Sequence, residues 1–316
     1  MTEAYMPLLS VEKLHVRYRA TGREVHAVDG VDLEIGRGET VGLVGESGCG
    51  KSTLGRAILR LTPASGGDIR LGGTSIAQLG QRALRVHRRR MQMVFQDPYG
   101  SLNPRQTVGT LLDTALRVHG LGDPAARRQR VGAMVQRVGL PASALERYPH
   151  EFSGGERQRI GIARALVLEP ELIVCDEPVS ALDVSIQAQI LNLLAELKQS
   201  LGLSYLFISH DLSVVRYFAD RVLVMYGGRI VESADHERLW RAPRHPYTRA
   251  LIAAVPSIDP QHRRRALAMP AEALSPRAAE GCRFRTRCPQ AQPRCGSEVP
   301  MLRAVSAGHQ AACHFA

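Results

Sequence analysis

The stretch Gly45-Glu46-Ser47-Gly48-Cys49-Gly50-Lys51-Ser52 decides the fold of this 316-residue chain. It matches the pattern G-x-x-x-x-G-K-[ST], in which glycines let backbone N–H groups converge on phosphate oxygens. The run before it, residues 39–45, predicts a short strand, and residues 51–61 carry apolar side chains at helical spacing. Strand, glycine-rich loop and helix in this order predict a phosphate-binding loop, the P-loop, in an α/β fold.

Each position of this loop has an expected contact with ATP. Lys51 bridges the β and γ phosphates, the Ser52 hydroxyl ligates Mg²⁺, and the helix N-terminus adds partial positive charge. Cys49 is also expected to pack inside the loop. The ATP-binding residues expected here are Gly45, Glu46, Ser47, Gly48, Cys49, Gly50, Lys51, Ser52 and Thr53.

Two acidic residues supply the carboxylates that ATP hydrolysis needs. The apolar run 172–175 predicts a buried parallel strand that ends in Asp176 and Glu177. Doubly wound sheets bind ligands at the carboxyl ends of their strands. We expect Asp176 to hold Mg²⁺, directly or through water, and Glu177 to orient and deprotonate the attacking water.

The hydrophobic pattern divides the rest of the chain. A mostly helical insertion is expected at about 97–165, in a stretch rich in proline. The segment 25–35 predicts a strand with a turn at Asp29-Gly30. Further strands are expected over residues 8–18, 172–177, 204–209 and 222–233. The expected domain limits are an ATPase domain over 1–255, a linker over 256–280 and a Cys-rich C-terminal extension over 281–316.

Composition excludes several classes of protein. A hydrophobic content of 44% is that of a globular chain, not of a disordered or collagen-like one. Neither an 18-residue apolar run nor a secretory signal is present, so we expect a cytosolic chain that neither spans a membrane nor is secreted. The 41 lysines and arginines exceed the 30 acids, and the net charge of +11 suits nucleic acid, an anionic membrane face or phosphates.

The order of further motifs resembles that of ABC-transporter ATPases. Phe152-Ser153-Gly154-Gly155-Glu156-Arg157-Gln158-Arg159 is similar to the signature sequence of that family, with Glu156 where many members have glutamine. The family motifs after it match Asp176-Glu177, Ser180-Ala181-Leu182-Asp183 and Ile208-Ser209-His210-Asp211. Gln96 falls where the family has its Mg²⁺- and water-sensing glutamine, and Tyr18 falls where an aromatic ring stacks on adenine.

This resemblance implies a RecA-like core with an antiparallel β segment, a helical subdomain and a site shared by two ATPase domains. Glu177, His210 and Lys51 would be catalytic, with His210 at the γ-phosphate. Ser52, Gln96 and Asp176 would hold Mg²⁺. The residues implied to contact ATP on the other subunit are Ser153, Gly154, Gly155, Glu156 and Asp183. Because one chain carries one P-loop and one signature, it must work as a pair.

Three more motifs resemble the ATPases of oligopeptide, dipeptide and nickel importers, and are closest to the F-type, second ATPase. They are QDPYGSLNP at 96–104, YPHE at 148–151 and HPYT at 245–248. The resemblance implies ATP-driven peptide import at the cytoplasmic face of the inner membrane. The implied partners are two transmembrane permeases, a second ATPase of the D type and a periplasmic or lipid-anchored binding protein, with no nucleic acid. Alternatives are import of nickel or another small solute, or a soluble ABC ATPase acting on nucleic acid.

Four of the six cysteines lie in the last 35 residues, at Cys282, Cys288, Cys295 and Cys313. In a reducing cytosol such a group favours metal ligation over disulfides. The spacing C-x5-C-x6-C-x17-C departs from the C-x2-C pairs of zinc ribbons. The resemblance implies a [4Fe–4S] cluster, as in some members of this branch; zinc and thiols that are free or paired remain the alternatives.

Overall fold

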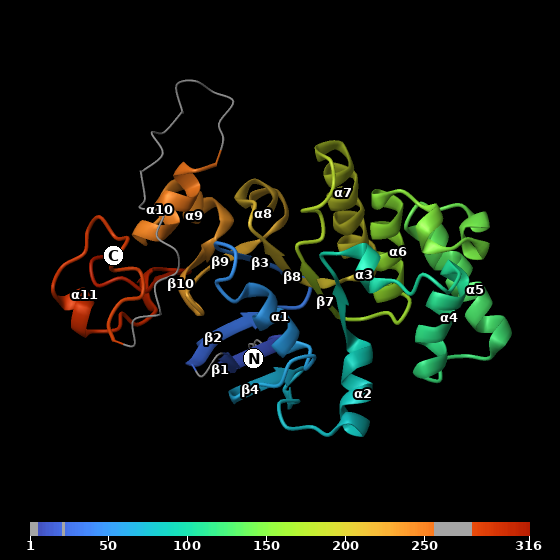
Figure 1. The fold of residues 1–316 in the computed structure, drawn as a ribbon, viewed down its shortest axis with the longest axis horizontal. Helices are drawn as coiled ribbons and strands as arrows, with labels where there is room; N and C mark the ends of the chain where they lie inside the picture. The colour runs from blue at the N-terminus through green and yellow to red at the C-terminus, as the bar shows by residue number, and fades with distance from the viewer. Residues whose placement is uncertain (1–5, 21–22, 256–279) are drawn as a thin grey trace, which may run out of the picture. The chain divides into compact units, whose positions relative to one another are not determined.

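The computed structural model describes residues 6–20, 23–255 and 280–316, and Figure 1 shows their elements as a ribbon. The chain forms two compact units, each built from several segments of sequence, and we describe them separately. Unit 1 comprises Met1–Ser10, Glu34–Glu39 and Ile69–Ile208, and unit 2 comprises Val11–Leu33, Thr40–Asp68 and Ser209–Ala316. Both contain strands and helices, which confirms the α/β class.

A parallel sheet forms the centre of unit 1. Its strand β7 (Leu172–Asp176) pairs with β6 (Met91–Val94) on one side and with β8 (Ser204–Ser209) on the other. Every residue of β7 and β8 is buried, as expected of strands whose two faces are both covered. Unit 1 also holds α2 (Gln81–Arg90), α7 (Val184–Leu201) and β5 (Thr74–Ser75), which pairs with the end of β4 (Gly66–Leu71) in antiparallel fashion.

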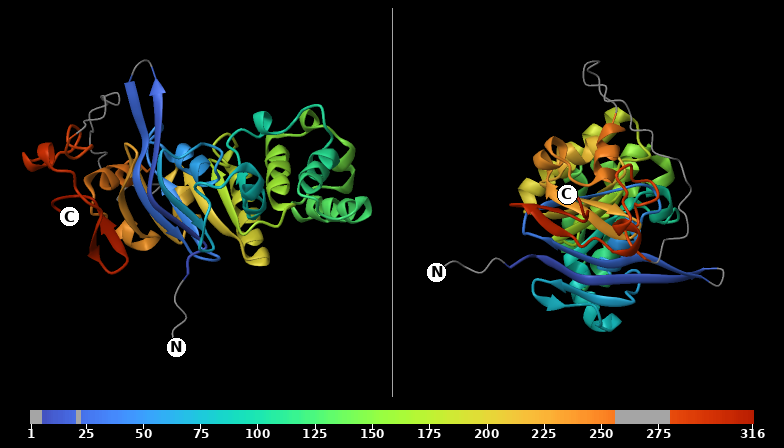
Figure 2. Two further views of the ribbon diagram at one scale, coloured as in Figure 1. Left: turned by 90° about the horizontal axis from the view of Figure 1, so that it is seen from below. Right: turned by 90° about the vertical axis from the view of Figure 1, so that its left-hand side faces the viewer.

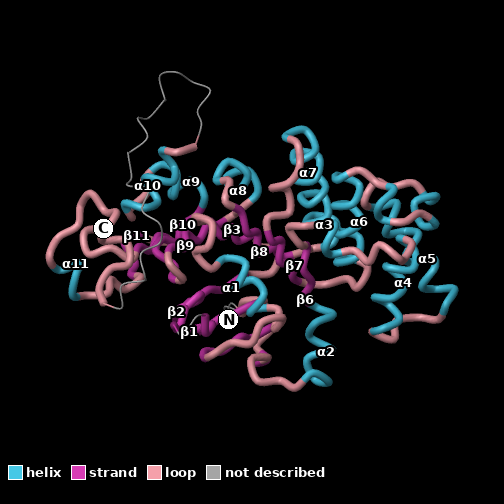
Figure 3. The backbone as a smooth tube through the Cα atoms, in the orientation of Figure 1, coloured by secondary structure: helices cyan, strands magenta, loops and turns pink. Residues whose placement is uncertain are grey.

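Between β6 and β7 the chain is helical, as Figure 3 shows. Its elements are α3 (Pro98–Ser101), α4 (Val108–Val118), α5 (Pro124–Arg137), the 3-10 turns Ala142–Glu146 and Pro149–Glu151, and α6 (Gly154–Leu166). Pro98 and Pro124 occupy the first helical positions, where the missing N–H costs nothing. The side chains of Asp97 and Asp123 cap these helices by accepting backbone N–H bonds. The prolines of this stretch therefore start helices as well as separating them.

Two long neighbouring strands in unit 2, β1 (Leu9–Ala20) and β2 (Arg23–Ile35), run side by side in both views of Figure 2. The predicted turn at Asp29-Gly30 is wrong, because β2 continues through it. Gly30 has a φ of 68°, and the Asp29 N–H donates to the Gly228 carbonyl at 2.9 Å. The hydrogen bond to Gly228, which lies outside β2, thus fixes the backbone at Asp29, and Gly30 accommodates the left-handed conformation that follows.

The remaining sheet of unit 2 reaches the end of the chain. Strand β3 (Thr40–Val44) is parallel to β9 (Arg221–Tyr226), and antiparallel pairs then join β9 to β10 (Arg229–Asp235), β10 to β12 (His309–Ala311) and β12 to β11 (Arg303–Ser306). The predicted strand 222–233 is therefore two strands, which turn at Gly227-Gly228. Among its described residues, unit 2 holds the helices α1 (Lys51–Ile58), α8 (Leu212–Phe218), α9 (His236–Arg241), α10 (Pro246–Ala253) and α11 (Arg294–Ser297).

The predicted linker, 256–280, lies outside the described residues except at its last position. The domain limits stay a prediction. Across the described ranges, no helix is both long enough and apolar enough to cross a bilayer.

Acidification should destabilise the start of α10. His245 is 1% exposed, its Nδ1 accepts the Tyr247 N–H at 3.1 Å, and burial lowers the pKa of its imidazole from about 6.5 to about 4. Between these values the unfolded chain binds a proton that the folded chain does not, so the free energy of unfolding falls as pH falls. From pH 7.5 to 5.0, wild type should lose on the order of 2 kcal/mol more than His245→Asn, which keeps a capping side chain. Urea unfolding at the two pH values measures this, and equal losses would contradict it.

Candidate nucleotide-binding site

The P-loop of unit 2 follows the buried strand β3 and leads into α1. Gly45 and Gly50 have φ values of 153° and 110°, and the backbone leaves no room for a side chain at either. A Cβ atom on Gly45 would lie 2.2 Å from the Met225 carbonyl oxygen, and one on Gly50 would lie 2.1 Å from that of Ala27. The loop is thus shaped by the backbone of β9 and β2, which it touches directly.

Lys51 opens α1 and is 4% exposed. Its Nζ donates to the Gly45 carbonyl at 2.7 Å and to the Glu46 carbonyl at 2.9 Å, so the ammonium group lies within the loop. Gly50 caps the helix without a side chain, which leaves N–H groups of the first turn directed into the loop. Cys49 is buried, as its packing role predicted, and Ser52 and Thr53 follow half-buried on the first turn of α1.

Glu46 carries two contacts that the sequence did not indicate. Its N–H donates to the Tyr247 hydroxyl at 2.8 Å, and its carboxylate accepts two bonds from the Arg287 guanidinium at 2.7 and 2.8 Å. Tyr247 belongs to the HPYT motif, and Arg287 directly precedes Cys288. The sequence singled out HPYT as a marker of a family branch and Cys288 as a candidate metal ligand, but neither indicated contact with the P-loop.

In unit 1, parallel pairing brings two of the predicted residues together. Gln96 follows β6 and Glu177 follows β7, and the Gln96 Nε2 donates to the Glu177 Oε2 at 3.1 Å. Glu177 has a φ of 49°, uncommon for a non-glycine residue, and its N–H donates to the Ile208 carbonyl at 2.9 Å. Asp176, at the end of β7, is 1% exposed. The backbone of Glu177 is fixed by β8, and its carboxylate is oriented by Gln96.

The signature segment forms the N-terminus of α6. Ser153 caps the helix, and the Glu156 carboxylate accepts both the Ser153 N–H and its hydroxyl at 2.8 Å. The hydrogen bond from the Ser153 backbone lowers the pKa of Glu156, so this side chain stays ionised. Ser153 and Gly154 are exposed, and a Cβ on Gly155 would lie 2.7 Å from the Ile186 Cγ2. Asp183 is also exposed, at the N-terminus of α7.

Two arginines of α6 connect the signature to the other branch motifs of unit 1. Arg157 donates to the Pro149 carbonyl at 2.7 Å, and its guanidinium lies 3.6 Å from the centre of the Tyr99 ring. Arg164 donates to the Ser101 carbonyl and faces the Phe95 ring at 5.5 Å. The QDPYGSLNP and YPHE loops are therefore held by one helix.

The predicted residues divide between the two units. Unit 1 holds Gln96, Ser153, Gly154, Gly155, Glu156, Asp176, Glu177 and Asp183. Unit 2 holds the P-loop, Tyr18, His210 and the four C-terminal cysteines. Tyr18 lies on β1 with 42% of its surface exposed, and His210 is exposed between β8 and α8.

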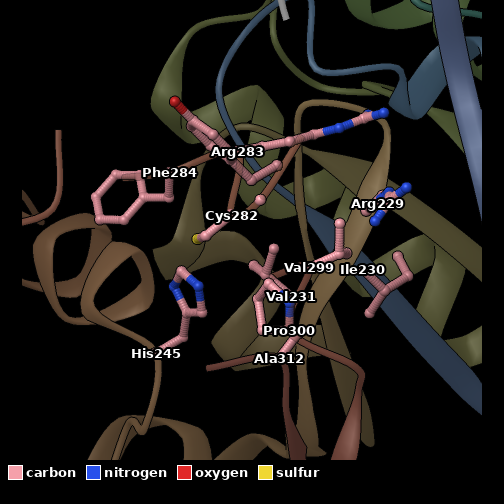
Figure 4. Close-up of a pocket in the computed structure, with 12 residues that line it drawn as sticks. Arg229, Ile230, Val231, His245, Cys282, Arg283, Phe284, Val299, Pro300 and Ala312 are labelled. Atoms are coloured by element: carbon pink, nitrogen blue, oxygen red, sulfur yellow. The ribbon is translucent and has the colours of Figure 1, made fainter. Parts of the chain in front are cut away.

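The predicted metal site in the tail is not supported. Within residues 6–20, 23–255 and 280–316, no three His, Cys, Asp or Glu side chains are placed to hold one metal ion. Burial raises the pKa values of Cys282 and Cys288, and the nearby tail cysteines raise them further. The Cys282 sulfur instead faces a small pocket beside His245 and Phe284 (Figure 4). Neither the [4Fe–4S] cluster nor zinc is therefore supported, and Cys282, Cys288, Cys295 and Cys313 form no disulfide.

Comparison with known proteins agrees with these motifs. The family described as ABC transporter matches residues 28–180, and the oligopeptide/dipeptide transporter C-terminal region matches residues 231–295. A protein of Brucella ovis named as a peptide import ATP-binding protein is 53% identical over 99% of this chain and 98% of its own. The chain belongs to the ABC transporter family. The oligopeptide transport ATP-binding protein OppF of Escherichia coli is 47% identical over 99% of this chain and 97% of its own.

Solved ABC structures have the same fold. The dimeric post-hydrolysis state of the ATP-binding cassette MJ0796, bound to ADP and Pi, is 28% identical with a TM-score of 0.66. It covers 72% of this ABC chain and 98% of its own. The same values hold for a second dimeric MJ0796 structure, described as a bacterial ABC transporter cassette. The ABC cassette fold predicted from the motifs is thereby confirmed.

Substituting Gly50 tests how tightly backbone contacts shape the P-loop of this ABC protein. Gly50→Ala places a methyl group against the Ala27 carbonyl, so we expect at least about tenfold weaker binding of a fluorescent ATP analogue and a clear loss in the free energy of unfolding. Gly38→Ala is the matched control, because Gly38 has a φ of 70° but open space around it. It should cost about 1 kcal/mol of stability and leave nucleotide binding intact. Equal binding by both variants would contradict the contact.

Proposed function

We propose that this chain is the ATP-hydrolysing subunit of an importer of di- or oligopeptides. The observation that carries the proposal is full-length similarity, at about half of all positions, to relatives named for peptide import and oligopeptide transport. The match of residues 231–295 to the oligopeptide/dipeptide transporter C-terminal region supports the same branch. Import of nickel or another small solute by the same machinery, or an action on nucleic acid, has no comparable support.

Phosphate binding is assigned to the P-loop. Backbone N–H groups around Gly48 and Gly50 and the ammonium group of Lys51 offer donors and positive charge to the β and γ phosphates. Lys51 would exchange its two carbonyl contacts for phosphate oxygens. Tyr18 is assigned to the adenine ring, for which its exposed ring is suitable.

Hydrolysis is assigned to the residues that follow β6 and β7. Glu177 would accept a proton from the attacking water, and Gln96 orients its carboxylate through the 3.1 Å hydrogen bond. The Ser52 hydroxyl, the Gln96 amide and the Asp176 carboxylate offer the oxygen ligands that Mg²⁺ prefers. Bound Mg²⁺ would neutralise charge on the phosphates. His210 is assigned to the γ-phosphate.

The signature is assigned to the nucleotide of a second ATPase subunit. Ser153 and Gly154 are exposed at a helix N-terminus, where a hydroxyl and N–H groups favour an anion. Asp183 would lie at the same contact. The second subunit would be a D-type paralogue, and the pair would act on two membrane permeases served by a binding protein. The chain would then lie at the cytoplasmic face of the inner membrane.

Replacing the proposed base separates binding from chemistry. Glu177→Gln should leave ATP binding intact, because the amide has the same shape, and should lower steady-state hydrolysis by about 10²–10⁴-fold. Phosphate release from the assembled transporter measures the rate. Glu146→Gln, which changes an exposed glutamate of the same unit, should keep wild-type turnover. Unchanged hydrolysis by Glu177→Gln would remove this residue from the role of base.

Two further variants distinguish the ATP site of this chain from its contact with the partner's ATP. Lys51→Ala should weaken nucleotide binding by the isolated chain, since it removes a cation from the P-loop. Ser153→Arg should leave that binding unchanged and block ATP-dependent pairing, as measured by equilibrium titration and by gel filtration. If both lost affinity equally, the signature would not act on a partner's nucleotide.

A further inference from the structure

Side chains fasten the C-terminal segment, residues 280–316, to the rest of unit 2. Arg283 donates to the Asp29 carboxylate and to the Gly227 carbonyl. The His309 Nε2 lies 2.7 Å from the Glu232 Oε1, with both side chains almost fully buried. Phe284 adds apolar contact, with its ring centre 5.2 Å from that of Tyr226. These contacts fix the position of the segment that carries Arg287.

Arg287 reaches the P-loop from this anchored segment. Its side chain is 12% exposed, against 35% for the Glu46 side chain that it binds. Two parallel N–H to oxygen bonds, at 2.7 and 2.8 Å, give the pair the forked geometry that fixes orientation as well as distance. The guanidinium also lies 5.9 Å from the centre of the Tyr226 ring. The pair is held rigidly on the arginine side.

Glu46 occupies an electrostatically unfavourable position. It is the second residue of a loop whose proposed ligand carries several negative charges, and its own carbonyl accepts a bond from the Lys51 Nζ. An unpaired carboxylate here would repel the phosphates and compete for Lys51. Arg287 compensates this charge, and the Tyr247 hydroxyl receives the Glu46 N–H from another side. The backbone of Glu46 and its charge are thus both set by residues from 245 onward.

We propose that Arg287 is a positioning residue for nucleotide binding, through which the C-terminal segment completes the P-loop of its own chain. The ligand class is a nucleoside triphosphate. The inference rests on the proposed function in one respect, because it takes the P-loop to be the place where ATP binds. It goes beyond that function in assigning part of the ATP affinity to a segment more than 200 residues away from the loop.

A charge-removal cycle on the full-length protein tests this. The probe is a fluorescent ATP analogue with Mg²⁺, titrated into wild type, Arg287→Ala, Glu46→Gln and the double variant. Arg287→Ala should bind roughly tenfold more weakly, because Glu46 is left as an unpaired charge. Glu46→Gln should bind at least as tightly as wild type. The double variant, which has neither charge, should return to within about twofold of wild type.

The salt dependence of nucleotide affinity distinguishes compensation of charge from a purely structural role of Arg287, because a structural defect would not depend on salt. The defect of Arg287→Ala should shrink between 0.05 and 0.5 M NaCl, because the Debye length shortens about threefold over this range and salt then shields the phosphates from the Glu46 carboxylate. In ATPase assays the defect should appear in KM, with kcat within about twofold of wild type. Arg294→Ala is the matched control, because Arg294 pairs with Glu298 inside the same segment. It should behave as wild type throughout.

Each outcome decides the inference. Wild-type affinity in Arg287→Ala would overturn it, as would a double variant as weak as Arg287→Ala, which would show that the segment acts through structure alone. If Arg287→Ala fails to fold, the affinity of the double variant for the ATP analogue is compared with that of Glu46→Gln. A tenfold difference in affinity between these two variants would overturn the proposal. If wild type did not bind the ATP analogue, or if Lys51→Ala bound it as tightly as wild type, the ATP site itself would instead be refuted.

Discussion

At two positions of the P-loop, Gly45 and Gly50, neighbouring backbone atoms lie so close that no side chain fits. These two contacts constrain the arrangement of the strands in unit 2. The Met225 and Ala27 carbonyl oxygens would lie 2.2 and 2.1 Å from a Cβ on Gly45 and Gly50. These oxygens belong to β9 and β2, so the loop keeps its shape only while both strands keep their places. The parallel pairing of β3 with β9 and the Asp29 N–H to Gly228 hydrogen bond therefore serve the loop as much as the sheet.

The parts of the site that sequence could predict are those whose geometry is local. The glycines and Lys51 of the P-loop, and the capped N-terminus at Ser153, each depend on neighbours within a few residues. Gln96 and Glu177 are 81 residues apart, yet both follow apolar strands, and parallel strands place their carboxyl ends at one edge. The sequence pattern predicted the strand before Glu177 but not β6 before Gln96, which the family resemblance alone singled out, so this contact came from the structure.

Other features depend on packing that no local pattern encodes. The contact between Glu46 and Arg287 spans 241 positions and involves a residue type found all along this arginine-rich chain. Asp29-Gly30 has the composition of a turn, but contacts with Gly228 and Arg229 keep it within β2. The sequence showed that four cysteines lie close together near the C-terminus. It did not show that burial raises the pKa values of Cys282 and Cys288, or that no three metal-ligating side chains among the described residues are placed to hold one metal ion.

The fastening of residues 280–316 has a consequence for anyone who wants a minimal cassette. Asp29, Glu46 and Glu232 each have a basic partner in that segment, and Glu232 is fully buried. Trimming the segment would remove Arg287 from Glu46, would leave Asp29 with Arg229, and would leave the Glu232 carboxylate with the backbone N–H groups of Arg244 and His245. A buried carboxylate that loses its basic partner is costly. A shortened cassette would therefore have to be redesigned first at Glu46, which loses its guanidinium partner, and at Glu232, which is sealed from water.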